Sequence, residues 1–536
     1  MKVEWGRRVL LLGLAGLALG GAPAARAVAA PLSFRVDSAR ARSLGGSRTV
    51  AAIPQGFVGA SIDYCSITYY ADGAGSARVL ANLIGALAGG RALLRVGGNG
   101  PEAPCPGRIH HPASTAIRAI RAVESVLAAR LLLGIDLEAH RLQKVRREVL
   151  ALVHGLGGRA TRRRIAAFEI GNEPDRYPRY GPSVPKRRAR PFFARYLRDF
   201  ERWTAVIRRA ARKPGFPVAG PALGRLGLPW ITPPNGGDFV RFVNSPARPK
   251  YVTFHRYALL GVGRTCPGAL CPTIPNLLSD AASRGLARPL ARFVAATPPG
   301  RVLRIDEMNS ITGGGTNGVS STFAAALWAL DASFEMAHVG ASGVNFHSFS
   351  DAAYALFSRT AAHGWIVRPE YYGLLMFSRA APAGSLLLRV HPDRAPSRGA
   401  NVNVWATHGR DGRTRVLIIN KDPLGHDVLL SGGGLPGTGS ASLLPLRAAA
   451  IGGGDACPPA YGAVGLCAFG EVSLGGRSFG PLVLGYPAGD ATSTGILAPP
   501  RATCDSPLPR NCETTLRAGR AEVSVPAASA VLLTAP

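Results

Sequence analysis

Short apolar runs of strand length alternate with longer segments of helical period between residues 57 and 349. The segments between the runs are rich in Ala, Leu and Arg, and their apolar positions recur with the period of a helix. The predicted strands are 57–64, 92–96, 130–137, 167–171, 216–220, 251–257, 302–307 and 343–349. Eight strands alternating with helices predict an α/β fold, a closed (β/α)8 TIM barrel, in which functional residues gather at the carboxyl ends of the strands.

The pattern changes beyond residue 380, where helical periodicity disappears and short apolar runs lie between Gly- and Pro-containing turns. These runs are 402–406, 416–420, 443–446, 471–474 and 530–533. They are typical of an antiparallel β-sandwich. An isolated strand at 32–36 has no early partner, so we expect it to cross back and join that C-terminal domain. The predicted organisation is a signal peptide at 1–30, an N-terminal strand at 31–50, the barrel at 51–380 and the β-sandwich at 381–536.

The N-terminus has the pattern of a secretory signal. Lys2, Arg7 and Arg8 precede an apolar run at 9–19, and small residues suited to signal peptidase follow at 25–30. This run is too short to span a membrane comfortably, and no later segment resembles a membrane span. We therefore expect a secreted, extracellular protein.

The cysteine count is even, which agrees with export to an oxidising compartment. Of the eight cysteines, three local pairs enclose small Pro- or Gly-containing loops, and the remaining two are left to each other. The predicted disulfides are Cys266/Cys271, Cys457/Cys467, Cys504/Cys512 and Cys65/Cys105. A zinc site is disfavoured because no C-x-x-C or histidine spacing supports it, and no other metal or cofactor is expected.

The formal net charge of +31 suggests a polyanionic partner such as nucleic acid or an acidic polysaccharide. However, only six of the basic residues are lysines, and the arginines are scattered through the predicted helices. A general bias toward arginine explains the charge equally well. No zinc-finger spacing, RNA-recognition signature or basic patch interleaved with aromatic residues is present, so no nucleic-acid partner is expected.

Polar residues are concentrated at the carboxyl ends of the predicted strands. Five such ends carry Asp63-Tyr64, Gly97-Gly98-Asn99, Asp136, His255-Arg256-Tyr257 and His347. A barrel would bring these ends to one rim. For Asp63 and Asp136, capping of the following helix is an equally good interpretation. For His255 and His347, the alternative is a histidine with satisfied hydrogen bonds in the core.

Two strand ends carry glutamates, Glu173 in Asn172-Glu173-Pro174 and Glu307 in Asp306-Glu307-Met308-Asn309. Strands four and seven lie nearly opposite each other in an eight-stranded barrel, and a pair of carboxyl groups is what glycosidic cleavage requires. Pro174 disfavours the helical region for the residue before it, so we expect Glu173 to be extended. Glu173 suits the acid/base and Glu307 the nucleophile, with Arg304 and Tyr257 expected to keep Glu307 ionised and oriented. Each glutamate taken alone would more ordinarily be a helix cap or a solvated residue.

With these motifs the sequence resembles glycoside hydrolase family 79, the heparanase and β-glucuronidase family of (β/α)8 retaining glycosidases. Residues 94–99 (LRVGGN) resemble the family's second-strand motif, 169–174 (EIGNEP) its acid/base motif and 255–257 (HRY) its sixth-strand motif. The most specific match follows the nucleophile. It consists of Gly313-Gly314-Gly315, residues 321–325 (STFAA) and Trp328.

The resemblance implies how a substrate is held. The N–H groups of Gly313 and Gly314 would receive the carboxylate of a uronic acid, and Tyr371 would add a hydroxyl; glycines allow this close approach. A plain flexible loop is the alternative for these glycines. The expected substrate-binding residues are Asn172, Asp63, Asn99, His255, Tyr257, Gly313, Gly314, His347 and Tyr371.

The implied activity is a metal-independent retaining β-glucuronidase acting on carbohydrate with a terminal or internal β-linked uronic acid, with exo action as the first choice. The sequence departs from the family at Asn99, where heparanase has a threonine, and no heparin-binding basic cluster aligns. Endo-acting, heparanase-like cleavage of acidic polysaccharide therefore stays open. So do a glycosidase of the same clan acting on neutral β-glycosides and, less favoured because both glutamates are intact, a non-catalytic carbohydrate-binding protein.

Overall fold

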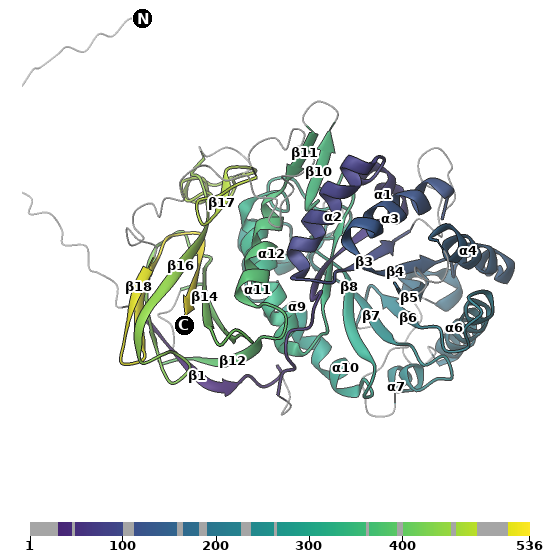
Figure 1. Cartoon of the computed structure of the whole chain (residues 1–536), viewed down its shortest axis with the longest axis horizontal. Helices are drawn as coiled ribbons and strands as arrows, with labels where there is room; N and C mark the ends of the chain where they lie inside the picture. The colour runs from purple at the N-terminus through teal and green to yellow at the C-terminus, as the bar shows by residue number, and fades with distance from the viewer. Residues whose placement is uncertain are drawn as a thin grey trace, which may run out of the picture.

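The computed structural model describes residues 31–44, 49–99, 112–157, 164–181, 190–226, 237–261, 265–360, 364–393, 400–451, 457–479 and 513–536. The predicted signal peptide at 1–30 lies outside these residues. The described chain forms a barrel surrounded by helices and, beside it, a curled sheet (Figure 1).

The barrel is closed by eight parallel strands in chain order, which confirms the predicted (β/α)8 arrangement. The strands are β2 (Val58–Asp63), β3 (Leu93–Gly97), β4 (Arg130–Ile135), β5 (Ile165–Ile170), β6 (Val218–Leu223), β7 (Tyr251–Leu259), β8 (Val302–Ile311) and β9 (Val344–Ser348). Each contains or overlaps one predicted apolar run. Buried on both faces, such strands read as continuous apolar runs.

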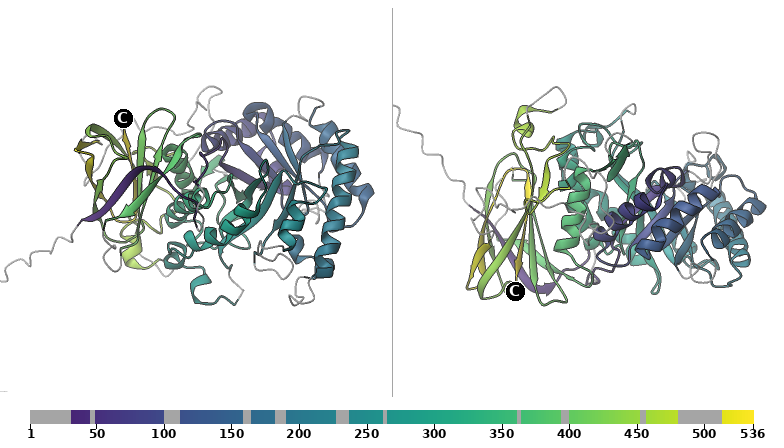
Figure 2. Two further views of the ribbon diagram at one scale, coloured as in Figure 1. Left: turned by 90° about the horizontal axis from the view of Figure 1, so that it is seen from below. Right: turned by 45° about the horizontal axis from the view of Figure 1, so that its top comes forward.

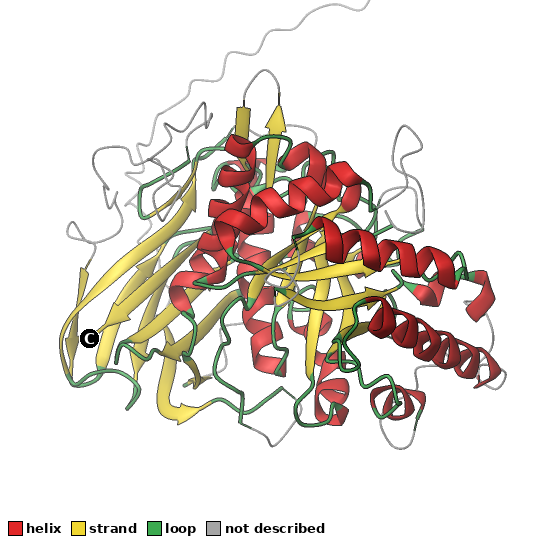
Figure 3. Ribbon diagram, turned by 45° about the vertical axis from the view of Figure 1, so that its right-hand side comes forward, coloured by secondary structure: helices red, strands yellow, loops and turns green. Residues whose placement is uncertain are grey.

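Helices cover the outside of the barrel (Figure 3). They are α1 (Tyr64–Tyr70), α2 (Ala74–Ala88), α3 (Ser114–Leu127), α4 (Leu142–Gly155), α6 (Arg190–Ala210), α7 (Asp238–Val243), α8 (Ile274–Leu277), α9 (Arg284–Ala287), α10 (Ala291–Ala296), α11 (Phe323–Val339) and α12 (Pro369–Ala380). Helix α11 is buried almost all round because it lies between the barrel and the second domain. Two one-turn helices, η1 (Pro174–Arg176) and η2 (Pro178–Tyr180), follow β5, and a hairpin of β10 (Phe357–Thr360) and β11 (Gly364–Val367) follows β9.

The second domain is one continuous hydrogen-bonded sheet of ten strands. They are β1 (Leu32–Arg40), β12 (Leu386–Pro392), β13 (Val402–His408), β14 (Thr414–Asn420), β15 (His426–Ser431), β16 (Thr438–Ala448), β17 (Val472–Leu474), β18 (Glu513–Arg517), β19 (Arg520–Val525) and β20 (Ser529–Ala535). A short helix, α13 (Pro459–Gly462), precedes β17. The predicted sandwich is confirmed only in part, because pairing of β16 with both β18 and β20 curls the sheet onto itself around a separate apolar core.

The N-terminal strand joins this sheet, as expected from its lack of an early partner (Figure 2). It pairs antiparallel with β12 on one side and parallel with β15 on the other. The sheet is therefore not purely antiparallel, which corrects the sequence-based expectation. A strand arriving from the other end of the chain is not bound by hairpin connections, so either direction is open to it.

Helix α11 joins the two domains through a buried ion pair and a ring stack. Trp405 of β13 stacks on Phe334 at 5.3 Å, and its indole N–H donates to Asp331 at 3.0 Å. Lys421 Nζ lies 3.1 Å from the same carboxylate. Burial raises the pKa of Asp331, but Lys421 and the hydrogen bonds more than offset this, so the pKa is lowered. The buried pair thus links the sheet to the barrel, and removal of either partner would leave an uncompensated buried charge.

Two of the predicted disulfides, Cys266–Cys271 and Cys457–Cys467, are present. Cys65 is also disulfide-bonded. Cys105 and the predicted pair Cys504/Cys512 lie outside the described residues. Across the described ranges, no helix combines the length and the apolar character that a membrane crossing needs.

Candidate active site

A cavity of about 260 Å³ opens at the carboxyl end of the barrel strands. Its lining residues are Asp63, Gly98, Asn99, Asn172, Glu173, Arg176, Tyr257, Glu307, Thr312, Gly313, Gly314, His347, Phe349 and Tyr354. All of the predicted site residues are here except His255 and Tyr371. A larger groove of about 1110 Å³ lies between the sheet and α9 and α11, but neither predicted glutamate faces it.

The two predicted glutamates meet in this cavity from opposite sides of the barrel. A carboxylate oxygen of Glu173, one of Glu307 and a ring nitrogen of His255 all lie within 4.8 Å of one another. His255 Nδ1 is 3.3 Å from Glu173 Oε1 and 3.7 Å from Glu307 Oε1. A retaining glycosidase needs its two carboxyl groups about 5 to 5.5 Å apart, whereas an inverting one needs a wider gap for water. One oxygen-to-oxygen separation of the two glutamates is thus at most 4.8 Å, which leaves less room than the gap that an inverting glycosidase needs.

Glu307 is held as a carboxylate by donors and positive charge. Arg95 Nη1 donates to Oε2 at 2.6 Å, and the Tyr257 hydroxyl donates to Oε1 at 2.8 Å. Burial raises the pKa of Glu307, but His347, His255 and Arg95 together more than offset it, so the pKa lies well below its usual range. Glu307 is thus ionised and oriented, as a nucleophile must be.

Arg95 organises the site, although the sequence predicted it only as part of a motif. Its side chain is fully buried inside the barrel. Besides Glu307 it donates to Glu169 Oε2 at 2.7 Å, Asn172 Oδ1 at 2.8 Å and Ser61 Oγ at 3.0 Å. A lone arginine within the apolar strand β3 was the available signal, because a buried guanidinium requires nearby carboxylates.

Arg304 does not contact Glu307, which corrects the sequence-based prediction. Its Nε donates to Asn345 Oδ1 at 2.6 Å and its Nη2 donates to the Gly56 carbonyl at 2.9 Å, both at the amino-terminal end of the barrel. Strand β8 carries one extra residue, Asp306, relative to β7. This bulge resets the alternation of side chains, so residues 304, 306 and 307 all make contacts inside the barrel, at different depths.

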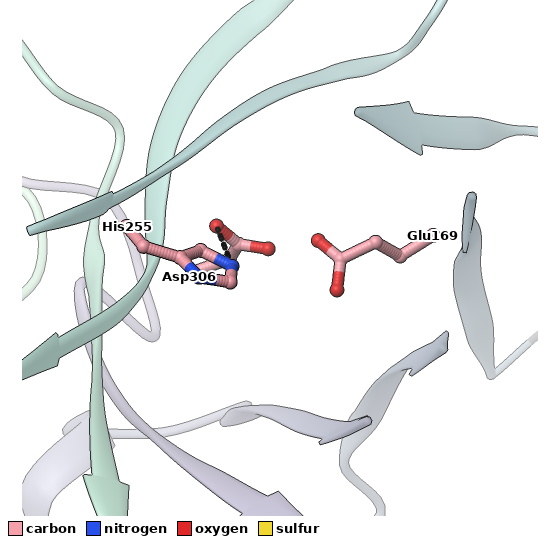
Figure 4. A group of neighbouring side chains, drawn as sticks. All are labelled: Glu169, His255 and Asp306. Carbon is pink, nitrogen blue, oxygen red and sulfur yellow. Dashed lines mark ion pairs between the residues drawn. The ribbon is translucent and has the colours of Figure 1, made fainter. Parts of the chain in front are cut away.

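A second layer of ionisable groups lies beneath the carboxylate pair, formed by Glu169, His255 and Asp306 (Figure 4). Burial raises the pKa of Asp306 far above its ordinary value, and the charge of Glu169 raises it further. Burial also raises the pKa of Glu169, but Arg95 more than offsets this, so that pKa is lowered. Asp306 is therefore the neutral member of the layer. His255 Nε2 stands 3.8 Å from its Oδ1.

Both groups of acidic residues and histidine have the composition of a metal site. Arg95, however, already supplies a cation to each of them, at 2.7 Å from Glu169 and 2.6 Å from Glu307. We therefore assign no metal here.

Glu173 adopts a left-handed backbone conformation, with φ 52° and ψ 52°, and not the extended one predicted from Pro174. Proline disfavours the right-handed helical region of the preceding residue, and Glu173 avoids that region by adopting the left-handed one. The Glu173 N–H donates to the Ala222 carbonyl at 3.0 Å, which fixes the turn. A non-glycine residue in this region is uncommon and costs energy, and such strain gathers at functional sites. In this structure the strained backbone belongs to Glu173, whose side chain lines the cavity.

Asn172, Asn99 and Asp63 complete the rim. Asn172 Nδ2 donates to Asn99 Oδ1 at 2.8 Å. Asp63 makes no capping bond to α1 and lines the cavity, with its pKa raised mainly by burial. Asp136 accepts the Ala139 N–H at 3.0 Å and pairs with Lys144, but α4 begins later, with Arg141 at its N-cap. Neither aspartate therefore caps the following helix through its side chain.

Two predicted substrate-binding residues lie outside the cavity. His255 is fully buried beneath the glutamates and does not line the cavity. Tyr371 lies on α12, where its hydroxyl donates to the Leu83 carbonyl at 2.8 Å and its ring packs on Phe479, so the expected hydroxyl contact is wrong. Tyr354, which the sequence did not single out, lines the cavity instead. It lies between β9 and β10, where no strand-end pattern marks it.

The glycine loop after β8 forms one wall. Gly313, Gly314 and Gly315 have φ values of 75°, 96° and 87°, a run that side chains rarely adopt. A Cβ added to Gly314 would lie 3.3 Å from the Phe349 ring. Thr312, Gly313 and Gly314 face the cavity, so their backbone groups can approach a bound molecule closely.

No protein-family model and no curated protein sequence matches the chain. Solved structures do match it. A 4-O-α-L-rhamnosyl-β-D-glucuronidase from Fusarium oxysporum 12S, in complex with Rha-GlcA, has a TM-score of 0.65 at 18% identity over 94% of this chain and 100% of that chain. An arabinofuranosidase of family 51 from Xanthomonas axonopodis pv. citri has a TM-score of 0.59 at 11% identity over 94% and 99%. An α-L-arabinofuranosidase from Thermotoga maritima has a TM-score of 0.56 at 12% identity over 94% and 99%. The chain thus has the fold of these glycoside hydrolases.

Proposed function

We propose that the protein is a secreted retaining glycoside hydrolase that removes terminal β-linked glucuronic acid. The observation that carries the proposal is the placement of Glu173 and Glu307, with carboxylate oxygens inside one 4.8 Å group. That spacing favours direct attack on the sugar over insertion of a water. The similarity in fold to glycoside hydrolases supports it.

In the first step, Glu307 attacks the anomeric carbon while Glu173 donates a proton to the glycosidic oxygen, so the leaving group departs as an alcohol. The product is a covalent ester between Glu307 and the sugar. In the second step, Glu173 removes a proton from water, which attacks the same carbon and releases Glu307. Arg95 and Tyr257 hold the attacking carboxylate, at 2.6 and 2.8 Å from its oxygens.

The acidic sugar is inferred from the glycine loop that forms one wall of the cavity. Successive left-handed glycines let the N–H groups of Gly313 and Gly314 approach a carboxylate closely. A cavity of about 260 Å³ suits a single terminal sugar, which supports exo action. Heparanase-like endo cleavage would need a longer groove along the same rim.

The test is a comparison of aryl β-glucuronide, aryl β-glucoside and aryl β-xyloside at equal concentrations. We expect the glucuronide to be hydrolysed fastest, with the Glu307→Gln protein as the control for contaminating activity. Faster cleavage of a neutral sugar would overturn the carboxylate assignment to the glycine loop and favour the neutral β-glycoside alternative. No cleavage of any of the three would favour the non-catalytic carbohydrate-binding alternative.

Secretion rests on the N-terminal sequence pattern. Expression of the full chain and N-terminal sequencing of protein from the medium tests it. Cleavage between residues 25 and 31 is expected, and retention of Met1 in cells would contradict it.

A further inference from the structure

Arg176 stands beside the acid/base on its solvent side. It is the last residue of η1, three positions after Glu173, and its Nε lies 2.6 Å from Glu173 Oε2. Its side chain lines the cavity and is 44% exposed, whereas that of Glu173 is 14% exposed. The other oxygen of Glu173, Oε1, faces His255 in the interior. The carboxylate is thus held between a buried imidazole and an exposed guanidinium.

This position corresponds to the leaving-group side of the scissile bond. Glu307 and its donor Arg95 are buried inside the barrel, so the sugar's anomeric carbon has to lie on that side of the cavity. Glu173 must face the glycosidic oxygen, and the departing group continues beyond it toward solvent. Among the described residues, Arg176 lines the cavity beside Glu173.

The Arg176 guanidinium has N–H donors that its contact with Glu173 does not use. An arginine offers five N–H donors in a planar fork, and the contact with Glu173 uses Nε. Within the described ranges, Glu173 is the only ion-pair partner of Arg176. Two neighbouring arginines form ion pairs with other residues: Arg179 pairs with Asp199, and Arg225 pairs with the buried Asp175.

The contact with Glu173 also leaves the guanidinium open to a second partner. Arg176 and Glu173 form an ion pair at 2.6 Å. A bound anion on the solvent side can accept hydrogen bonds from the remaining N–H groups. A carboxylate or a similar oxyanion is the natural ligand, since its two oxygens match the arginine fork.

We propose that Arg176 forms a leaving-group subsite for an aglycone that bears a carboxylate near the glycosidic bond. This inference rests on the proposed glucuronidase function and names the leaving group that the same site prefers. Arg176 is a specificity-determining residue, and Glu173 keeps the proton transfer.

The test uses two matched substrates, 4-carboxyphenyl and 4-carbamoylphenyl β-glucuronide. The measured quantity is the kcat/KM of the carboxyl substrate divided by that of the carbamoyl substrate, which removes differences common to both. We expect this ratio to fall about tenfold in Arg176→Gln, mainly through KM, because one charge-assisted contact is lost. Arg176→Lys should restore part of it.

The control is Arg179→Gln, which removes an equally exposed arginine of the adjacent η2 that does not line the cavity. Its ratio should match the wild-type ratio, and thermal unfolding of each variant checks the fold. An unchanged ratio in Arg176→Gln, or an equal fall in Arg179→Gln, would overturn the subsite while leaving the proposed function intact. Failure of the wild-type protein to cleave either glucuronide would overturn the proposed function and the subsite with it.

Discussion

Two buried arginines occupy opposite ends of the same barrel and meet opposite surroundings. Arg95, near the carboxyl end, contacts Glu169 and Glu307, and Asp306 lies 3.6 Å away. Burial lowers the pKa of Arg95, but these acids more than offset it, so the pKa is raised. Arg304, at the amino end, contacts the Asn345 amide and backbone carbonyls, and burial lowers its pKa to about 10.

The two surroundings indicate two roles. The carboxyl end of the barrel serves function, and the amino end serves closure of the fold. At the amino end, the Arg304 cation donates to carbonyl groups that point into the bottom of the barrel, which is a structural role. The carboxyl end gathers more negative than positive groups in a buried space. Such an arrangement costs stability, so it is expected where ionised groups do chemistry. The following predictions test this separation.

The largest effect is expected at the nucleophile. Glu307→Gln keeps the size of the side chain and removes the attacking oxygen, so kcat for an aryl β-glucuronide should fall at least about 10⁴-fold. Initial rates on purified protein measure it, with thermal unfolding to confirm folding. Retention of more than a tenth of the wild-type kcat would remove Glu307 from this role.

A smaller loss is expected for Arg95→Lys. Lysine keeps the charge but cannot reach Glu307, Glu169 and Asn172 together, so kcat should fall about 10²- to 10³-fold. Steady-state kinetics and unfolding by urea separate activity from stability. A variant with normal kcat would show that charge alone, without the fork geometry, organises the carboxyl end.

The matched substitution at the other end is Arg304→Met. It should leave carbonyl and amide groups unsatisfied and lower the free energy of unfolding by about 3 kcal/mol, while kcat per folded molecule stays within about twofold. Urea unfolding measures the free energy of unfolding, and active-site titration allows kcat to be expressed per folded molecule. A hundredfold loss of kcat in fully folded protein would mean that the two ends are coupled.

The smallest expected effect concerns Asp306 and pH. Because its pKa is raised in the folded protein, the stability from neutral Asp306 is complete below the ordinary pKa of 3.8 and is lost as pH rises. Asparagine cannot ionise, so Asp306→Asn should gain about 1 kcal/mol or more relative to wild type between pH 4 and pH 7. Urea unfolding at both pH values measures the change, and a constant difference would contradict a neutral Asp306.

The barrel and its glutamate pair were predictable because the signals for both lie in short, continuous stretches of the sequence. Each strand is a continuous apolar run, and each catalytic candidate ends one. The sheet domain was predicted less well, because the β16–β20 pairing that closes it and the parallel pairing of β1 with β15 join distant segments. Local patterning carries little information on such contacts.

Within the site, the errors concern contacts that a local sequence pattern does not show. The prediction joined Arg304 to Glu307 because both lie on one strand, whereas the donor to Glu307 is Arg95 of the separate strand β3. Tyr354 comes from a loop between strands, and its place in the cavity is set by tertiary packing. Tyr371, chosen by resemblance alone, packs against α2 instead.

The most direct test of the account is the anomeric form of the first product. Proton NMR of aryl β-glucuronide hydrolysis, recorded before mutarotation, reports it. The close placement of Glu173 and Glu307 predicts that β-glucuronic acid appears first. First appearance of the α-anomer would mean single displacement by water and would contradict the central claim.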